Sequence, residues 1–409
     1  MAATHDIQMQ DGAQQATYSD VSDLNEQKQT FKIGTRKSML AIVQTDEVVQ
    51  ALKKQWPNHH FEVIKMSTTG DNNQSTALHK FNAKALWTQE LEVELLEGGL
   101  DLIVHSLKDM PTQLPTDLDL GCITKRKDPR DALVIKPTLL ERHHSLADLP
   151  EDAVIGTSSL RRTAQLKRQY PHLKFADVRG SVGTRLAKLD NPHSEYSAII
   201  LAAAGLERLG QGNRITTYLS KANGGMLYAV GQGALGIEIR KDDTRVIELL
   251  EKIGCEQTTR QGLAERSLMR TLEGGCSVPI GIETEWIPRK TYITEGSGVG
   301  IKPGDEYDSL SGVTAQPQGP PQGLTHAPSN PGKVENGKGD SDEMIMRAIV
   351  VSLDGQDAAE VESRKIVRSS EDALQFGWDV ARLLVEKGAD KILEAITLNR
   401  GIIEKQGDA

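Results

Sequence analysis

Cysteine is scarce in this chain: three cysteines, Cys122, Cys255 and Cys276, are scattered over 409 residues. So few thiols exclude a disulfide framework and favour a reducing compartment. CxxC and HExxH motifs are absent, so the sequence predicts no dedicated zinc site. The apolar runs, such as residues 198–206, are too short to span a membrane. The first 30 residues hold one lysine and no arginine, which argues against a transit peptide, so we expect a cytoplasmic protein.

Positive charge is also in short supply, with 48 Lys and Arg against 57 Asp and Glu and a formal net charge of −9. This balance disfavours binding to nucleic acid or to an anionic membrane. Residues 155–190 depart from it, because they contain eight Lys or Arg and two Asp or Glu. A basic cluster in an acidic protein predicts a local site for a small polyanion, although a solvated mixed-charge helix face would have the same composition.

Two segments lack the apolar residues that a core requires. Residues 1–30 are polar and rich in Gln, and residues 295–341 are rich in Pro, Gly, Ser and Asn. Such compositions cannot bury enough apolar surface to offset the entropy lost on ordering. We therefore predict a disordered N-terminal tail and a disordered insertion, and expect the insertion not to carry the site.

The rest of the chain alternates strand-like and helical patterns. Short apolar runs predict strands at residues 31–36, 61–66, 101–106, 153–159, 175–180, 198–205 and 233–240. Apolar residues at helical spacing predict helices over 38–55, with Ser38 as N-cap, and over 88–99. This alternation predicts mixed, largely parallel sheets covered on both faces.

Beyond Cys276 the pattern changes. Residues 346–355 and 362–370 read as the two strands of a hairpin. A helix is predicted over 369–396, with Ser369 and Asp372 at the spacing of a capping box. The C-terminal part is therefore expected to be a small α+β unit.

Four short segments at predicted strand ends combine small polar residues with cations: GTRKS, HSLKDMP, GTSSLRR and RGSVGTR. Ligands of α/β sheets gather where strands end, and helix N-termini there suit anions. The arginine guanidinium pairs with a carboxylate through two parallel hydrogen bonds. Five arginines in such places predict a ligand with several carboxylates, although each alone could form an exposed salt bridge. The candidate residues are Arg36, Ser38, Ser106, Lys108, Asp109, Thr157, Ser158, Ser159, Arg161, Arg162, Arg179 and Arg185.

A phosphate or dinucleotide ligand has less support. A P-loop is absent, and GQGALG at residues 231–236 has the glycine spacing of a dinucleotide motif but precedes a strand. Asp109 is the one acidic residue among these cations. It could form an ion pair with Lys108, or it could stabilise a developing cation or shuttle a proton.

Cys276 lies in the stretch TLEGGCSVPIG, residues 271–281. Two preceding glycines and a following Ser-Val-Pro suggest that its thiol is presented on a tight loop. A free cysteine is more often a small buried apolar residue, so this stretch alone leaves both interpretations open.

Taken together, six motifs resemble those of the porphobilinogen deaminase family, also called hydroxymethylbilane synthases. They are HSLKDMPT, GTSSLRRTAQL, RGSVGTRLAKLD, ILAAAGLERLG, VGQGALGIE and LEGGCSVPIG. They occur in the family's order, and the resemblance covers about residues 31–290 and resumes at about 345–400. It implies a transferase of porphyrin and heme biosynthesis that acts as a monomer on the small molecule porphobilinogen, without nucleic acid, membrane or metal.

The resemblance also implies a reaction and a set of roles. Four porphobilinogen molecules are joined, with loss of ammonia, to a dipyrromethane cofactor, and hydrolysis then releases hydroxymethylbilane. Cys276 corresponds to the cysteine that holds the cofactor through a thioether, and Asp109 to the catalytic aspartate. Arg36, Arg161, Arg162, Arg179 and Arg185 correspond to arginines that bind substrate and cofactor carboxylates. Further polar contacts are implied for Ser38, Lys84, Lys108, Thr157, Ser159, Gln44 and Gln232.

The fold implied is α/β, with two doubly wound mixed-sheet lobes around a cleft, similar to periplasmic binding proteins, and a small α+β C-terminal domain. Domain 1 is expected over residues 31–125 and 232–252, domain 2 over 130–228, and domain 3 over 256–400, interrupted by the insertion at 295–341. Two crossings between the lobes would make the cleft hinged, with Cys276 carried toward its mouth.

Two other functions remain open from the residues alone. A non-enzymatic two-domain anion-binding protein would place a ligand between α/β lobes in the same way, without a covalent group on Cys276. A cysteine-dependent acyl transferase would need a base to activate the thiol. His105 is the histidine within the motifs and would have to approach the thiol through tertiary folding.

Overall fold

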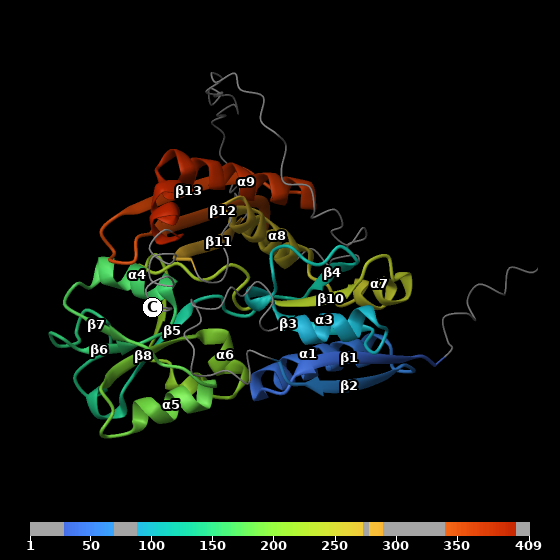
Figure 1. Cartoon of the computed structure of the whole chain (residues 1–409), viewed down its shortest axis with the longest axis horizontal. Helices are drawn as coiled ribbons and strands as arrows, with labels where there is room; N and C mark the ends of the chain where they lie inside the picture. The colour runs from blue at the N-terminus through green and yellow to red at the C-terminus, as the bar shows by residue number, and fades with distance from the viewer. Residues whose placement is uncertain (1–27, 69–87, 273–277, 289–339, 398–409) are drawn as a thin grey trace, which may run out of the picture.

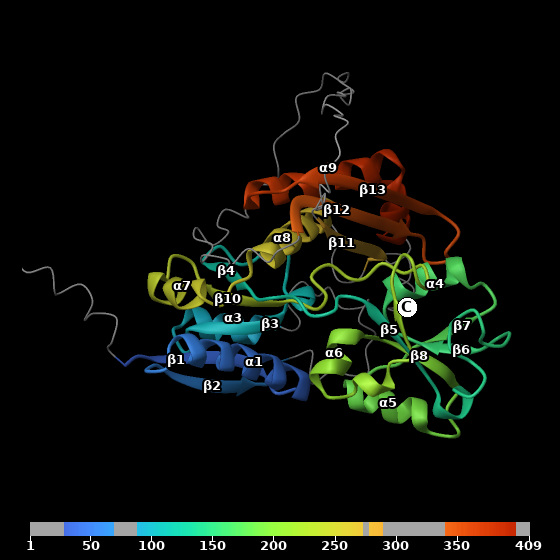
Figure 2. The same cartoon turned by 180° about the vertical axis from the view of Figure 1, so that it is seen from behind.

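The structure, a computed structural model, describes residues 28–68, 88–272, 278–288 and 340–397 (Figure 1). Lys84, Cys276, nearly all of the predicted N-terminal tail and nearly all of the predicted insertion lie outside these residues. Two five-stranded sheets lie side by side, and a three-stranded sheet with its helices lies against both of them (Figures 1 and 2). The predicted α/β class, with two mixed-sheet lobes and a small α+β unit, is confirmed.

The first sheet has the strand order β2-β1-β3-β10-β4. Its strands are β1 (Thr30–Arg36), β2 (His60–Met66), β3 (Leu102–Ser106), β4 (Leu118–Ile123) and β10 (Leu235–Arg240). Strands β1, β2 and β3 are parallel, whereas β10 runs antiparallel to both β3 and β4. Their buried apolar side chains form one core, so the distant β10 is an integral part of this sheet.

Helices α1 (Met39–Gln55), α3 (Gln89–Leu96) and α7 (Thr244–Glu251) pack on the first sheet. Ser38 precedes α1, and its Oγ accepts a hydrogen bond from the Ala41 amide at 3.3 Å, which satisfies one of the free N–H groups of the first turn. Val48 and Leu52 lie on one face because they are four residues apart, and both are buried. The predicted helix over 38–55 and its N-cap are confirmed.

The second sheet has the order β7-β6-β8-β5-β9. Its strands are β5 (Asp131–Ile135), β6 (Val154–Gly156), β7 (Lys174–Ala176), β8 (Tyr196–Ala202) and β9 (Thr217–Leu219). Strands β6, β7 and β8 are parallel, and β5 is antiparallel to β8 and β9. The two large sheets therefore share a design of three parallel strands followed by one antiparallel strand.

Three helices follow the parallel strands of this sheet: α4 (Leu160–Gln169), α5 (Val182–Asp190) and α6 (Ala203–Arg208). Short 3₁₀ helices are η3 (Leu107–Asp109), η4 (Pro137–Leu139) and η5 (Gly212–Arg214). The strand predicted over 198–205 is wrong at its C-terminal end, since β8 ends at Ala202 and α6 begins at Ala203. Alanine has the highest helix propensity, so the alanines at the start of α6 favour a helix there.

The chain passes from the first sheet to the second after β4 and returns before β10. We call residues 124–130 the first crossing and residues 220–234 the second crossing. Gly231 and Gly233 in the second crossing have φ values of 71° and 89°, a conformation that glycine adopts readily. The domain limits proposed from the sequence stay a prediction.

The third sheet is antiparallel, in the order β11-β12-β13, with β11 (Ile280–Pro288), β12 (Asp340–Val351) and β13 (Ala358–Ile366). Helices α8 (Glu256–Thr271) and α9 (Ser370–Glu386) pack together, and their apolar residues share a core with this sheet. The predicted hairpin is confirmed. So is the capping box, in which Ser369 Oγ accepts from the Asp372 amide and Asp372 accepts from the Ser369 amide.

The single helix predicted over 369–396 is wrong in its length. Helix α9 ends at Glu386, and a second helical segment begins at residue 389. Gly388 separates them with φ of 91°, the left-handed conformation typical of a helix C-terminus.

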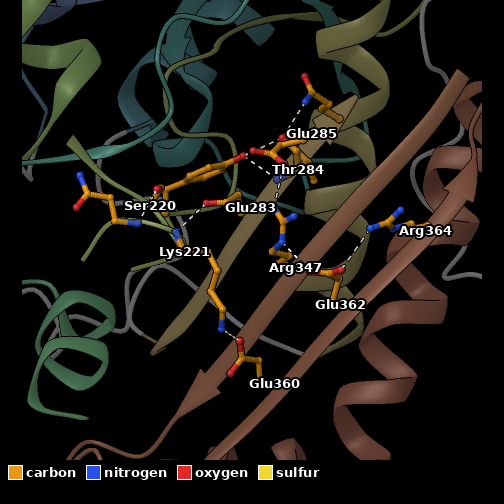
Figure 3. A network of polar contacts seen from close by, with 12 residues as sticks. Ser220, Lys221, Glu283, Thr284, Glu285, Arg347, Glu360, Glu362 and Arg364 are labelled. Carbon is orange, nitrogen blue, oxygen red and sulfur yellow. Dashed lines mark hydrogen bonds and ion pairs between the residues drawn. The ribbon is translucent and has the colours of Figure 1, made fainter. Parts of the chain in front are cut away.

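A polar network ties the third sheet to the second crossing (Figure 3). Arg347 of β12 binds Glu283 and Glu285 of β11 at 2.7 and 2.9 Å and Glu362 of β13 at 2.7 Å. Glu283 also accepts a hydrogen bond from the backbone amide of Lys221 at 3.1 Å. The Lys221 ammonium forms an ion pair with Glu360. These contacts join the C-terminal unit to the segment that follows β9.

Candidate active site

The predicted site residues lie where parallel strands end. Arg36 is the last residue of β1, Ser106 is the last residue of β3, and Lys108 and Asp109 follow in η3. In the second sheet, the GTSSLRR segment follows β6 and enters α4, and the RGSVGTR segment follows β7 and enters α5. Ligands of open α/β sheets bind at this edge.

In the first lobe, α1 is tied to the end of β3. Gln44 Nε2 donates to Ser106 Oγ at 2.8 Å, and Gln44 is buried with 5% of its surface exposed. Ser38 holds the start of α1, as described above. Since β1 and β3 are parallel neighbours in register, Arg36 lies at the same edge as Ser106. The hydrogen bonds of Gln44, Ser38 and Ser106 therefore fix the start of α1 and the end of β3 at this edge of the sheet.

In the second lobe, Arg161 and Arg162 of α4 share one carboxylate. Arg161 Nη1 lies 2.7 Å from Asp131 Oδ2, and Arg162 Nη2 lies 2.7 Å from Asp131 Oδ1. Each arginine also donates to a backbone oxygen, Arg161 to Leu227 at 2.6 Å and Arg162 to Ile200 at 2.8 Å. Both arginines are buried, so they are held in fixed orientations rather than exposed to solvent.

Asp131 is a residue that the sequence reasoning missed. It is the first residue of β5 and is 0% exposed. Burial alone would raise its pKa, but the charges and hydrogen bonds of Arg161 and Arg162 outweigh burial and lower the pKa below its usual range. The signal available was an Asp at the end of the polar stretch KRKDPRD, directly before an apolar strand.

The small polar residues of the second lobe hold the loops in place. Ser158 Oγ donates to the Val178 carbonyl at 3.1 Å, and Thr157 Oγ1 accepts from the Ser159 amide at 3.2 Å. Arg185 Nε donates to the Gly180 carbonyl at 2.8 Å, next to Arg179 in the loop before α5. These bonds connect the loops after β6 and β7 and fix the positions from which the arginines project.

The pKa shifts show that the two lobes meet at these residues. Burial, together with the positive charges of Arg162 and Arg179, lowers the pKa of Arg185 to about 10, and the charge of Asp109 in the first lobe opposes this shift. Burial likewise lowers the pKa of Lys108, with Asp109 opposing and Arg162 adding to the effect. Lys108 and Asp109 therefore lie within electrostatic reach of the arginines of the second lobe.

This group of residues, which we call the arginine cluster, contains more cations than carboxylates. It consists of Lys108, Asp109, Asp131, Arg161, Arg162, Arg179 and Arg185. Mutual repulsion among buried cations favours any ligand that brings negative charge. A ligand with several carboxylates fits this donor set because guanidinium groups bind carboxylates in a bidentate manner.

Gln232 lies at the junction of the two crossings. Its Nε2 donates to the Pro129 carbonyl at 2.7 Å and to Asp131 Oδ1 at 3.1 Å. Its backbone oxygen accepts from Arg126 Nε at 2.8 Å, and Arg126 pairs with Glu265 of α8 at 2.6 Å. Gln232 is thus linked to the arginine cluster through Asp131.

His105 is not suited to act as a base for a cysteine. It is buried in β3, and its Nε2 lies 2.8 Å from Glu238 of β10. Cys122 is buried in β4, and Cys255 is half-buried at the N-terminus of α8. Among the described residues, no group of three or more His, Cys, Asp or Glu is arranged to hold a metal ion, and no helix is long and apolar enough to cross a bilayer.

Two family models match this chain. The model described as "Porphobilinogen deaminase, dipyromethane cofactor binding domain" matches residues 31–248, and the one described as "Porphobilinogen deaminase, C-terminal domain" matches residues 259–294. The chain belongs to the porphobilinogen deaminase family. It is therefore a transferase of tetrapyrrole biosynthesis with a dipyrromethane cofactor. This assignment does not support the non-enzymatic anion-binding alternative.

Curated porphobilinogen deaminases are similar over most of their length. The enzyme of Yarrowia lipolytica is 46% identical over 371 residues, which is 90% of this chain and 93% of that protein. The enzyme of Saccharomyces cerevisiae is 42% identical over 377 residues, which is 91% of this chain and 98% of that protein. The enzyme of Synechococcus elongatus is 50% identical over 290 residues, which is 70% of this chain and 88% of that protein.

Solved structures with a distant resemblance include the methionine-binding protein MetQ, at a TM-score of 0.33 and 12% identity over 56% of this chain and 90% of that chain. The BenM effector-binding domain with benzoate has the same TM-score and 15% identity over 55% of this chain and 90% of that chain. Scores this low do not bear on the function of a porphobilinogen deaminase.

Proposed function

We propose that the arginine cluster is the active site of this transferase and that Cys276 carries the dipyrromethane through a thioether. The observation that carries the proposal is the convergence of Asp109 and Lys108 of one lobe with Arg162 and Arg185 of the other. Cys276 lies outside the described residues, and its role rests on the LEGGCSVPIG motif and on its place between α8 and β11.

The proposed task of the cations is to bind carboxylates. Porphobilinogen carries an acetate and a propionate, and each added pyrrole brings two more carboxylates. Arg161, Arg162, Arg179 and Arg185 would hold these groups by paired hydrogen bonds, and Arg36 would do so from the first lobe. The proposed further contacts to substrate or cofactor are Ser38, Gln44, Lys84, Ser106, Lys108, Thr157, Ser158, Ser159 and Gln232.

The proposed task of Asp109 is to stabilise positive charge. The amine of the porphobilinogen aminomethyl group, protonated as an ammonium, leaves as ammonia and takes the electron pair of the carbon–nitrogen bond. The pyrrole nitrogen then donates its own electron pair toward the remaining methylene carbon, so the ring nitrogen carries the positive charge. A fixed carboxylate near that charge lowers the barrier because it requires no reorganisation during the reaction. When bound, the dipyrromethane supplies the nucleophilic pyrrole carbon, and the proton displaced from that carbon passes to a base or to water.

The experiment is an intact-mass measurement followed by steady-state kinetics. Wild-type protein from a host that makes porphobilinogen should carry an adduct of two pyrrole units, and Cys276→Ala should lack it. Asp109→Ala should remain folded and lose activity by about 10²–10³-fold or more. Asp242→Asn, a change of an exposed turn carboxylate, is the matched control and should remain active. Unmodified wild-type protein, or a fully active Asp109→Ala variant, would contradict the proposal.

We further propose that the enzyme acts as a monomer in the cytoplasm on free porphobilinogen. The scarcity of cysteine supports the compartment. A sedimentation measurement at working concentration tests the monomer, and a dimer would overturn it.

A further inference from the structure

We propose that Asp131 is a positioning residue for carboxylate binding, fixing the orientation of the Arg161 and Arg162 guanidinium groups. The inference rests on the proposed function of the arginine cluster and adds to it a residue that does not contact the substrate.

The geometry places one buried carboxylate between two arginines. Asp131 Oδ2 lies 2.7 Å from Arg161 Nη1, and Asp131 Oδ1 lies 3.0 and 2.7 Å from Arg162 Nε and Nη2. Asp131 itself is fixed by the backbone, since β5 pairs with β8 on one side and β9 on the other at this residue. A carboxylate so held sets the spacing between two side chains that would otherwise sample many rotamers.

The contacts with Asp131 and the backbone use only some of the N–H donors of each guanidinium group. Arg161 directs Nη1 to both Asp131 and the Leu227 carbonyl, and within the part of the chain that the structure describes its Nε and Nη2 are left for another acceptor. Arg162 uses Nε and Nη2 on Asp131 and Nη1 on the Ile200 carbonyl, so N–H bonds of Nη1 and Nη2 remain. On this proposal, the remaining donors of the two arginines are the ones that bind a carboxylate of the ligand.

The charge of Asp131 has a second effect. Arg161 and Arg162 are adjacent in α4, and the charge of Arg162 lowers the pKa of Arg161 in addition to burial, whereas Asp131 opposes both. A neutral residue at position 131 would leave two repelling cations beside Lys108. They would separate or rotate toward solvent, because isolated buried charges are costly.

Asp131 also links the arginines to the two crossings through a hydrogen bond with Gln232. Gln232 of the second crossing donates to Asp131 Oδ1 and to the Pro129 carbonyl of the first crossing. The amide therefore gives Asp131 Oδ1 a further donor beside those of Arg162. A change at position 131 should disturb ligand binding before it disturbs the sheets, whose cores lie elsewhere.

The test compares Asp131→Asn and Asp131→Glu with Asp128→Asn, a matched change of the Asp128 carboxylate that pairs with Arg130 in the first crossing. Asn keeps the shape and removes the charge, whereas Glu keeps the charge and moves it by one methylene. Three quantities are measured for each protein: the melting temperature, the fraction carrying the two-pyrrole adduct by intact mass, and KM and kcat for porphobilinogen.

A positioning role predicts that both Asp131 variants fold, raise KM by about tenfold or more, and lower the adduct fraction, with kcat reduced less than KM is raised. Asp128→Asn should match wild type in all three. A Glu variant that behaves as wild type would show that charge without position suffices and would overturn the proposal. An unchanged KM and adduct fraction in Asp131→Asn would also overturn the proposal. Failure of both variants to fold would overturn it as well, because Asp131 would then be required for the fold.

Arg161→Leu separates this inference from the proposed function. If Arg161→Leu leaves KM and adduct content unchanged, the arginine cluster is not the site and the proposed function fails. If Arg161→Leu is impaired while Asp131→Asn equals wild type, the site is correct and the positioning role alone fails.

Discussion

At the scale of single residues, the same kind of buried ion pair occurs in the arginine cluster and away from it. Asp131 and Glu265 are both 0% exposed, and each is paired with buried arginine. Such pairs are kept only where geometry and further hydrogen bonds compensate the loss of water. Glu265 accepts such further hydrogen bonds from the Gly231 amide and the Thr284 hydroxyl. Asp131 accepts one from the Gln232 side-chain amide.

The cysteines give a prediction at this scale. Burial raises the pKa of Cys122 to about 12, so at pH 8 about one thiol in ten thousand is ionised. Cys255 is half-buried, and its sulfur accepts a hydrogen bond from Thr258 Oγ1 at 3.3 Å. Iodoacetamide should therefore alkylate Cys255 of the native protein well before Cys122, as followed by peptide mass spectrometry. In urea the two rates should become equal, and equal rates in the native protein would contradict the burial argument.

At the scale of elements, the sequence predicted what local pattern controls. The helix over 38–55 and the capping box at Ser369 follow from spacing and from cap chemistry, which act within a few residues. The end of β8 and the break at Gly388 were missed, because an apolar or amphipathic run continues through both. The pairing of Asp131 with Arg161 could not be predicted, since it joins two elements only after the second sheet forms.

Helix α9 gives a prediction at this scale. A Cβ on Gly377 would lie 2.0 Å from the Ala264 carbonyl oxygen of α8, so the two helices approach closely there. Gly377→Ala gains helix propensity of about 1 kcal/mol, but the clash with a rigid backbone costs more, and we expect a net loss of roughly 2 kcal/mol in the free energy of unfolding.

The matched control is Gly183→Ala in α5, where the nearest atom to the added Cβ is Ser181 Oγ at 4.0 Å. This change should leave the free energy of unfolding unchanged or raise it by up to about 1 kcal/mol. Urea unfolding of both variants provides the measurement. A stabilised Gly377→Ala variant would show that α8 and α9 can move apart without cost.

At the scale of the whole molecule, both crossings end in contacts with the C-terminal unit. Arg126 of the first crossing pairs with Glu265 of α8, and Gly231 of the second crossing donates to the same carboxylate at 2.7 Å. Arg266 of α8 donates to the Met110 and Pro111 carbonyls, which follow Asp109. Helix α8, which precedes Cys276 in the sequence, therefore contacts both the crossings and the segment that carries Asp109.

The network of Figure 3 gives a prediction for this attachment. Arg347 neutralises Glu283, whose side chain is 7% exposed, and Glu283 receives the Lys221 amide from the second crossing. Arg347→Met would leave Glu283 without its cation and close to the carboxylates of Glu285 and Glu362. Because Arg347 is itself partly exposed, we expect a loss of about 2 kcal/mol rather than the larger cost of a fully buried pair.

Lys221→Met is the matched control, because it removes an ion pair with Glu360 in which both side chains are more than two-fifths exposed, at 44% and 43%. Exposed pairs contribute about 0–1 kcal/mol, so its melting temperature should stay near that of wild type. Calorimetry is the appropriate measurement, since a chain with three sheets can unfold in more than one transition. Equal shifts in the two variants would mean that Glu283 needs no cation to keep its hydrogen bond with the Lys221 amide.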